Sequence, residues 1–296
     1  MGLHNWFLQQ LGCLGASLPG LRQRIYVAAI WFRRNRKSIR VLKRRIDEQN
    51  RQFQVRTVMD WIAVAPLRTA PLVSVVLPTR DRCGLLPRAI ASVMGQSYGN
   101  WELLVVDDES VDGTPAFMAG IADERIRAFR GRGAGVCAAR NVALAQARGA
   151  LVAYLDDDNI MHPGWLKAVL WAFEQHPATE VLYGAFIVDD KARLAGHGKG
   201  QMPQLYFHSY SYRGAAKHNI ADMGCIAHRA ELPEARFDES LREFGDWDLF
   251  LRLTRHSKPL ALPAIACFYT TDAPNRLSWG PTFHAEKALV QAKNHR

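Results

Sequence analysis

The chain has 296 residues, of which 48% are hydrophobic and 22% are charged, and its formal net charge is +10. Residues 1–70 contain 13 of the 38 Lys and Arg but three of the 28 Asp and Glu, so residues 71–296 are neutral with 25 of each kind. This balance excludes a nucleic-acid-binding role for the larger part, and the length suits one α/β domain with a terminal extension.

The cysteines are odd in number and scattered, without a C-x-x-C pair: Cys13, Cys83, Cys137, Cys225 and Cys267. This spacing indicates neither a disulfide framework nor a thiolate zinc site, and it fits a reducing cytosol. Residues 1–20 have no basic segment ahead of their apolar residues, and no stretch approaches the ~18 apolar residues that span a bilayer. We therefore expect a cytoplasmic protein that is neither exported nor membrane-spanning.

Residues 21–58 lack Pro and Gly, and apolar residues recur at every seventh position, which predicts one long helix. The repeating positions are Ile25, Phe32, Ile39, Ile46 and Phe53. Three interpretations stay open: a basic amphipathic helix on the anionic inner face of the cytoplasmic membrane, an arm that binds a helical partner, or a solvated helix covering the main domain. Pro66 and Pro71 mark a linker, so we predict an extension over residues 1–70 and a domain over residues 71–296.

Strand and helix signals alternate after residue 71. Strands are predicted over residues 73–77, 102–106, 126–129 and 151–155, and helices over residues 85–94, 114–121, 134–147 and 165–173. A further amphipathic helix is expected over residues 247–252. This alternation predicts a parallel, doubly wound α/β sheet that binds ligands at the carboxyl ends of its strands.

Acidic clusters fall at that edge of the predicted sheet. Asp156, Asp157 and Asp158 follow one strand, and Asp107 and Asp108 follow another. Because neighbouring carboxylates stay ionised only when a cation or hydrogen-bond donors compensate them, the first cluster indicates a place where a hard divalent metal meets a polyphosphate. The alternative is an acidic surface turn.

Seven segments carry a family resemblance in one order: Val73–Asp81, Ala91–Tyr98, Trp101–Thr114, Ala138–Asn141, Leu155–Asn159, Phe237–Leu241 and Gly245–Arg252. Together they resemble the family 2 glycosyltransferases over residues 72–280. The resemblance implies a GT-A fold with a Rossmann-like, doubly wound mixed sheet. It also implies metal-dependent, inverting transfer of one sugar from a nucleotide donor, expected to be a UDP-sugar, to a saccharide or lipid-linked acceptor in cell-surface glycan synthesis.

The resemblance also implies roles for single residues. The nucleotide pocket would contain Pro78, Thr79, Asp81 and Asp108, and Arg140 would also bind the nucleotide. Asp157 would either reach the ribose or be a solvated residue in the middle of the turn. Asp156 and Asp158 match the D-x-D motif and would hold Mn²⁺ or Mg²⁺. Asp246 matches the catalytic base, with a helix N-cap as the alternative. Asp272 would replace a metal-ligating histidine that this sequence lacks.

Two further features depart from the family pattern. Gly245 stands where many relatives have Glu, and the Q-x-x-R-W signature of processive synthases is absent. The aromatic residues from Tyr206 to Tyr212 either form an acceptor wall or pack on themselves. Two rival functions remain: a catalytically idle nucleotide-sugar scaffold, and a nucleotidyltransferase, which should have a Gly-rich basic loop after its first strand.

Overall fold

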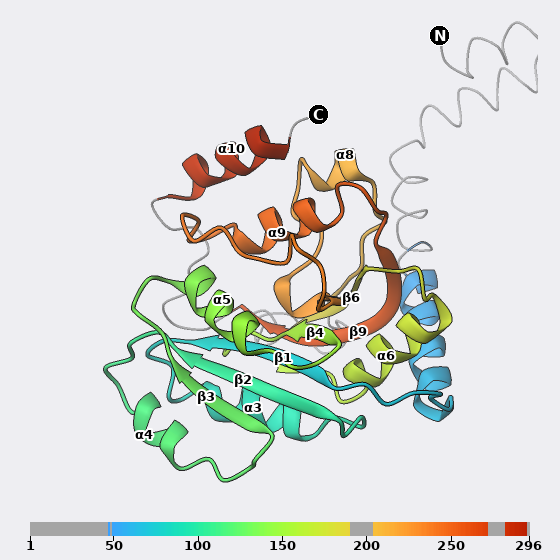
Figure 1. The fold of residues 1–296 in the computed structure, drawn as a ribbon. Helices are drawn as coiled ribbons and strands as arrows, with labels where there is room; N and C mark the ends of the chain where they lie inside the picture. The colour runs from blue at the N-terminus through green and yellow to red at the C-terminus, as the bar shows by residue number, and fades with distance from the viewer. Residues whose placement is uncertain (1–46, 48, 190–203, 272–281, 295–296) are drawn as a thin grey trace, which may run out of the picture. The chain divides into compact units, whose positions relative to one another are not determined.

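The computed structural model describes residue 47 and residues 49–189, 204–271 and 282–294. The chain divides into two compact units, residues 1–52 and residues 53–296. Most of the predicted helix over residues 21–58, and Asp272, lie outside the described residues. In the second unit the described strands form one sheet in the order β3-β2-β1-β4-β8-β6-β9-β5, and β7 pairs with β6 (Figure 1).

The first half of the sheet is parallel, as the alternating pattern predicts. It contains β1 (Val73–Thr79), β2 (Trp101–Asp107), β3 (Ile126–Arg130) and β4 (Leu151–Tyr154), with β1 between β2 and β4. The connecting helices are α3 (Leu86–Met94), α4 (Thr114–Ala119) and α5 (Val136–Gln146). Every residue of β1, β2 and β4 is buried, because helices cover both faces of a parallel sheet.

The second half of the sheet is mixed, which confirms the family expectation and corrects the fully parallel arrangement expected from the alternation alone. Its strands are β5 (Ile160–Met161), β6 (Val181–Asp189), β7 (Gln204–Tyr206), β8 (Ile226–Arg229) and β9 (Leu260–Thr270). Strand β8 inserts antiparallel between β4 and β6. The helices after β4 are α6 (Trp165–Gln175), α8 (Tyr212–Ala215), the 3₁₀ turn η1 (Met223–Cys225), α9 (Gly245–Leu253) and α10 (Phe283–Asn294).

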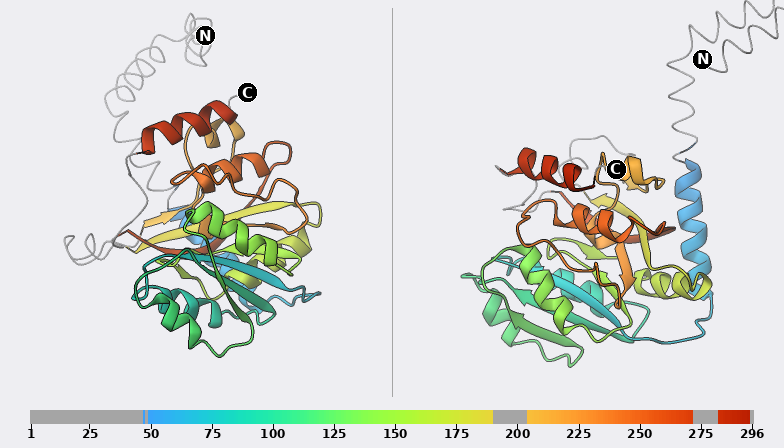
Figure 2. Two further views of the ribbon diagram at one scale, coloured as in Figure 1. Left: turned by 60° about the vertical axis from the view of Figure 1, so that its left-hand side comes forward. Right: turned by 45° about the horizontal axis from the view of Figure 1, so that its top comes forward.

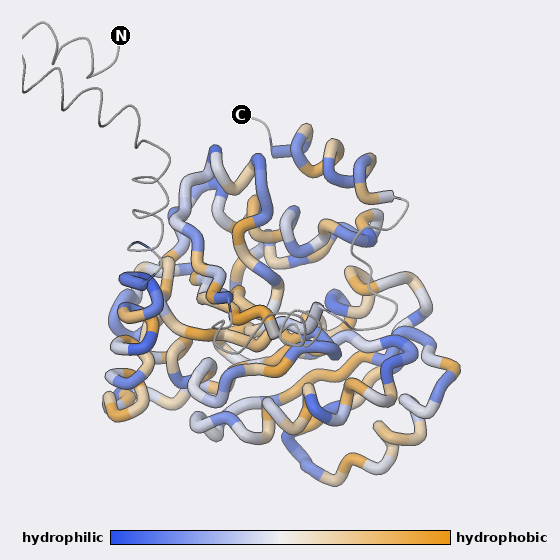
Figure 3. The backbone as a smooth tube through the Cα atoms, turned by 180° about the vertical axis from the view of Figure 1, so that it is seen from behind, coloured by the Kyte–Doolittle hydropathy of each residue, from blue (hydrophilic) through white to orange (hydrophobic). Residues whose placement is uncertain are grey.

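The core has two layers, one on each face of the sheet. Successive residues of a strand point to opposite faces, so Val75 packs in the layer of α3 and α6, and Val76 packs in the layer of α5 and α9. Figure 2 shows α3 and α5 on opposite sides of the sheet, and Figure 3 shows the hydrophobic residues running along the strands.

Residues 53–64 are helical and belong to the second unit. Ile62 joins the core layer of α3 and α6, and Val55 packs against Ala185 of β6 and Leu205 of β7. This part of the predicted extension therefore contributes to the core of the domain. Among the described residues, no helix combines the length and apolar character needed to cross a bilayer.

Candidate active site

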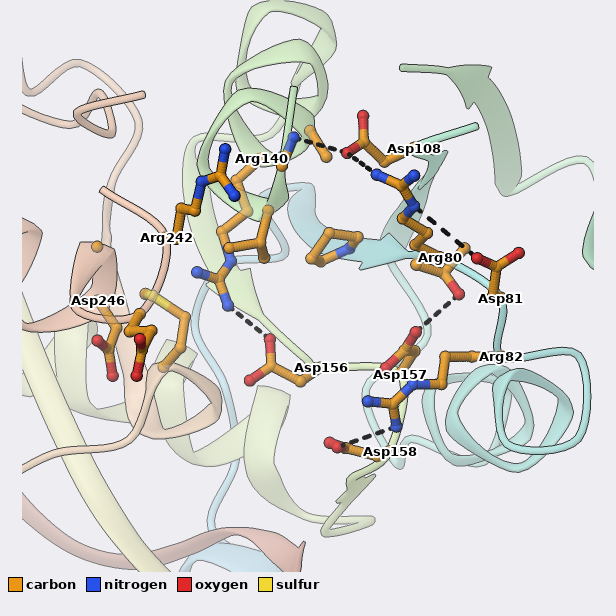
Figure 4. A pocket seen from close by; sticks show the side chains of 18 of the residues that line it. Arg80, Asp81, Arg82, Asp108, Arg140, Asp156, Asp157, Asp158, Arg242 and Asp246 are labelled. Carbon is orange, nitrogen blue, oxygen red and sulfur yellow. Dashed lines mark hydrogen bonds and ion pairs between the residues drawn. The ribbon is translucent and has the colours of Figure 1, made fainter. Parts of the chain in front are cut away.

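A cavity of about 640 Å³ lies where β1, β2 and β4 end and where α5 and α9 begin. The sequence-predicted site residues that line it are Pro78, Thr79, Asp81, Asp108, Arg140, Asp156, Asp157, Asp158 and Asp246. Figure 4 shows side chains from the loops after β1, β2 and β4, from α5 and from α9 around this space. The remaining predicted residue, Asp272, lies outside the described part of the chain.

Asp108 presents a buried acceptor to the cavity. The residue is 3% exposed, and its Oδ2 accepts a hydrogen bond of 2.7 Å from the amide of Gly135 at the start of α5. Its Oδ1 is buried and has no hydrogen-bond partner among the described residues. Gly131 makes this arrangement possible, because a Cβ there would lie 2.6 Å from Oδ1 of Asp108. An unpaired buried carboxylate oxygen is costly unless a ligand donates to it.

Asp81 joins the loops that follow β1 and β2. Its Oδ1 accepts from the amide of Val111 at 2.7 Å, and its own amide donates to Oγ of Ser110 at 2.8 Å. The backbone of Asp81 is left-handed, with φ of 52°. The Arg80 guanidinium lies between two acids, 3.9 Å from Asp81 Oδ2 and 4.0 Å from Asp108 Oδ2. These contacts fix the rim of the cavity beside Asp108.

Asp157 is buried, so the interpretation of a solvated middle residue is wrong. Its Oδ2 accepts a hydrogen bond of 2.8 Å from Oγ1 of Thr79, which links the ends of β1 and β4. Burial is the largest influence on its carboxyl and raises the pKa to about 7, and the charges of Asp158 and Asp156 act in the same direction. The hydrogen bond from Thr79 opposes this rise.

The other two acids of the turn have separate cationic partners. Arg140 of α5 donates to Oδ1 of Asp156 at 2.7 Å, and Arg82 lies 3.5 Å from Oδ2 of Asp158. Arg88 donates to the backbone oxygen of Asp158 at 2.6 Å. The three carboxylates therefore point in different directions (Figure 4), and protein groups compensate their repulsion.

The turn also has the chemistry of a hard-cation site. The side chains of Asp156 and Asp158 keep 27% and 16% of their surface exposed, and both line the cavity. Carboxylate oxygens are the ligands that Mg²⁺ and Mn²⁺ prefer, and such ions keep positions for water and phosphate. The residues present thus fit a divalent cation, whereas Oδ2 of Asp157 is held by its hydrogen bond from Thr79.

Asp246 is the second residue of α9 and faces the same cavity. It does not cap that helix: the cap position is Phe244, which makes no side-chain cap bond. Oδ2 of Asp246 accepts from Nδ2 of Asn219 at 3.0 Å, and Oδ1 accepts from the amide of Trp247 at 2.7 Å. Burial raises the pKa of the Asp246 carboxyl, while the nearby charge of Arg140 lowers it. Such a carboxylate is suited to accepting a proton.

The glycine before Asp246 has a packing explanation. A Cβ at Gly245 would clash with Sγ of Cys137 on α5, and Gly245 is buried. Helices α5 and α9 thus approach closely at this point, which leaves no room for a Glu side chain at residue 245. Asp248, in contrast, braces the helix: it is fully buried and lies 2.8 Å from Arg252 and 2.9 Å from Lys293.

Asp222 is a cavity residue that the sequence interpretation missed. Its Oδ1 accepts from the amide of Gly224 at 3.0 Å, and ligand atoms of Asp222, Cys225 and Cys267 lie within 4.8 Å of one another. Burial raises the pKa of Asp222 well above its ordinary value, and the charges of Asp156 and Asp246 add to this effect. No local signal marks Asp222, because it follows no strand and belongs to no acidic run.

The predicted acceptor wall is divided between two environments. Tyr210 donates to the backbone oxygen of Thr254 and packs against Phe250, so it contributes to the core. Tyr206 instead stacks on Phe186, with ring centroids 5.0 Å apart and planes at 5°. Phe186 in turn contacts Tyr269, which lines the cavity. Of these three rings, Tyr269 of β9 lines the cavity, and Phe186 and Tyr206 pack behind it.

Comparisons with known proteins agree with this site. Residues 74–231, just over half of the chain, match the family described as Glycosyl transferase family 2. WcaA of Escherichia coli (strain K12), named as a colanic acid biosynthesis glycosyl transferase, is 32% identical over 193 residues, or 63% of this chain and 67% of WcaA. The succinoglycan biosynthesis protein ExoO of Rhizobium meliloti (strain 1021) is 31% identical over 193 residues, or 60% of this chain and 54% of ExoO.

Solved structures give the same fold. TarS of S. aureus, residues 1–349, crystallised in complex with UDP-GlcNAc, aligns with a TM-score of 0.58 at 19% identity, over 74% of this chain and 65% of that one. At this identity the likeness concerns the fold alone. The family match, the fold and the grouping of the motif residues around one cavity lead to one conclusion: the chain belongs to glycosyl transferase family 2 and is a glycosyltransferase with a GT-A fold.

Proposed function

We propose that this enzyme transfers one sugar, with inversion, from a UDP-sugar to a saccharide or lipid-linked acceptor in the synthesis of a cell-surface polysaccharide, on the cytoplasmic side of the membrane. The names of WcaA and ExoO, which refer to colanic acid and succinoglycan, support the process. TarS complexes with UDP-GlcNAc and UDP support the donor class. The single observation that carries the proposal is the unpaired, buried Oδ1 of Asp108 in the same cavity as the acidic turn and Asp246.

The donor nucleotide would occupy the end of the cavity formed by β1 and β2. Oδ1 of Asp108 accepts a hydrogen bond from an N–H of the base, which supplies the donor that this buried oxygen lacks. The Gly135 amide already holds the other oxygen of Asp108, so the carboxylate keeps its orientation without the ligand. A preorganised acceptor of this kind selects a base with an N–H at the matching position.

The diphosphate would lie toward the acidic turn, where Asp156 and Asp158 would hold Mn²⁺ or Mg²⁺. When bound, the cation supplies a Lewis acid that stabilises the charge of the departing nucleoside diphosphate. Arg140 neutralises Asp156 through a contact of 2.7 Å, which lowers the negative potential that an incoming diphosphate meets. Asp157 keeps its hydrogen bond with Thr79, which holds the ends of β1 and β4 together.

The acceptor would approach Asp246, which takes the proton of the attacking hydroxyl group as the new bond to the anomeric carbon forms and the bond to phosphate breaks. The Asn219 and Trp247 hydrogen bonds fix both oxygens of Asp246. Tyr269, which lines the cavity and packs against Phe186, offers a ring on which an acceptor pyranose can stack. Attack opposite the leaving group then inverts the anomeric configuration.

The test combines binding and turnover. Isothermal calorimetry with UDP and a panel of UDP-sugars, with and without Mn²⁺, should give binding that Mn²⁺ strengthens at least tenfold. Asp246→Asn should retain UDP affinity within about threefold and lose transfer to a saccharide acceptor by 10³-fold or more, about the contribution of a general base. Glu124→Gln, an exposed carboxylate away from the cavity, is the matched control and should change neither quantity.

Three results would contradict parts of the proposal. Absence of binding by every UDP-sugar would remove the donor assignment. Full transfer by Asp246→Asn would remove the base assignment, and binding without transfer by the wild-type enzyme would favour the nucleotide-sugar scaffold.

A further inference from the structure

The helix over residues 53–64 has two apolar faces. Val55 and Ile62 are buried against the domain, whereas Phe53, Trp61 and Val64 are 72%, 61% and 78% exposed. At about 100° of rotation per residue, these three exposed side chains fall within an arc of about 80°, on the side of the helix opposite Ile62. Exposed Thr57 and Asp60 lie between Phe53 and the pair of Trp61 and Val64 on this side of the helix. We call the three apolar residues the outer strip.

The outer strip stands apart from the rest of the described surface. Six large hydrophobic residues are prominently exposed in the described ranges, and three of them are Phe53, Trp61 and Val64. The others, Met94, Val111 and Leu289, lie on separate elements. Scattered exposed hydrophobic residues need no explanation, but a cluster on one helix face indicates a binding surface.

The charge of the chain identifies the kind of partner. Residues 1–70 contain 13 basic and three acidic residues and carry all of the net charge of +10. Arg51 and Arg56 are exposed on the helix that carries the outer strip, and Arg56 lies 4.0 Å from Asp60 at an exposed contact. A basic segment that precedes, in the sequence, a helix with exposed apolar residues and an exposed Trp is the pattern of attachment to the interface of an anionic membrane.

We propose that the outer strip docks this enzyme on an anionic lipid surface, with Phe53, Trp61 and Val64 entering the headgroup region and the basic residues of the leading segment attracting the lipid phosphates. The inner face of the same helix holds the domain to this surface, because Val55 and Ile62 are part of its core. The proposal goes beyond the transfer reaction and does not depend on the identity of the donor.

The experiment uses the full chain and vesicles of phosphatidylcholine with 30% phosphatidylglycerol in a sedimentation assay. The test variant combines Phe53→Ser, Trp61→Ser and Val64→Ser, and the matched control combines Met94→Ser, Val111→Ser and Leu289→Ser, which remove the same number of exposed hydrophobic residues elsewhere. The test variant should bind vesicles at least tenfold more weakly than wild type, whereas the control should bind as wild type does. Both should show the wild-type thermal unfolding transition.

Two further measurements identify the partner. Wild-type binding should fall at least tenfold in 1 M salt or on pure phosphatidylcholine, because screening removes the attraction to anionic lipid. Brominated lipids should quench tryptophan fluorescence of the wild type, and Trp61→Phe should lose most of this quenching while still binding.

Several outcomes would overturn the proposal: equal vesicle binding by wild type and the test variant, equal losses in the test and control variants, or binding that ignores lipid charge. A concentration-dependent dimer that only the test variant abolishes would also overturn it and would assign the outer strip to a contact between copies of the chain. Calorimetry with UDP on the same samples keeps this result separate from any failure of the donor assignment.

Discussion

Arg140 and Asp156 form an ion pair of 2.7 Å that joins the first half of α5 to the acidic turn after β4. Arg140 is almost completely buried, and the central carbon of its guanidinium group lies 5.2 Å from the centre of the Phe237 ring. The Arg140 guanidinium is thus a fixed positive charge that contacts the turn and also acts on Asp246, where it opposes the rise in the carboxyl pKa that burial causes. One cation thus influences both the proposed metal site and the proposed base.

We expect Arg140→Leu to weaken UDP binding by tenfold or more, because the uncompensated charge of Asp156 then repels the diphosphate. The free energy of unfolding should fall by about 2 kcal/mol, less than for a fully buried pair because Asp156 is partly exposed. A double-mutant cycle with Asp156→Asn, measured by urea unfolding, should give a coupling of about 1–2 kcal/mol. Strict additivity would show that the ion pair has no energetic role.

Gly131→Ala should impair nucleotide binding through Asp108. The added Cβ would lie 2.6 Å from Oδ1 and 3.0 Å from Cα of Asp108, so the carboxylate has to move. We expect UDP affinity to fall at least tenfold with a loss of stability of about 1–2 kcal/mol. Gly99→Ala is the matched control, since a Cβ at Gly99 meets nothing within 4 Å. Equal affinities for UDP in calorimetry would contradict the assigned role of Asp108.

His228 should make the fold sensitive to acid. It is fully buried, its Nε2 lies 2.7 Å from the Tyr154 hydroxyl group, and burial lowers its pKa to about 4. Between pH 6.5 and 4 the unfolded chain binds a proton that the folded protein excludes, so stability falls as the pH falls, by at most about 1.4 kcal/mol per pH unit.

The measurement is chemical denaturation of wild type and His228→Gln at several pH values. The variant should be less stable at neutral pH because it disturbs a buried hydrogen bond, and the difference between the two proteins should shrink toward pH 4. His256→Gln, at an exposed position, should follow the wild type throughout. Parallel pH profiles for wild type and His228→Gln would be inconsistent with a buried neutral imidazole.

Asp248→Asn should be strongly destabilising. Asp248 is fully buried and contacts both Arg252 and Lys293, so its loss leaves two cations without their shared anion. We expect a loss of about 3 kcal/mol in urea unfolding, and UDP affinity should be unchanged once the protein is folded. Asp60→Asn breaks a highly exposed contact with Arg56 and should change stability by less than about 0.5 kcal/mol.

The sequence alone determined the parallel half of the fold and the side of the sheet that binds ligand. Apolar runs of strand length ending in acids predict that Asp108 and Asp156–Asp158 share one edge, because the carboxyl ends of neighbouring parallel strands meet there. The structure confirms β1, β2, β3 and β4 in this arrangement and brings these acids to one cavity. Local pattern was sufficient, since each motif lies directly after its own strand.

Only the tertiary structure decided which groups the acids contact. Strand β8 runs antiparallel beside β4, so its beginning lies near the end of β4 and carries Asp222 to the acidic turn. The close approach of Gly245 to Cys137, and the separate partners of Asp156, Asp157 and Asp158, likewise join segments far apart in the chain. Such contacts depend on strand insertion and helix packing. The periodicity of apolar residues within a local segment does not reveal them.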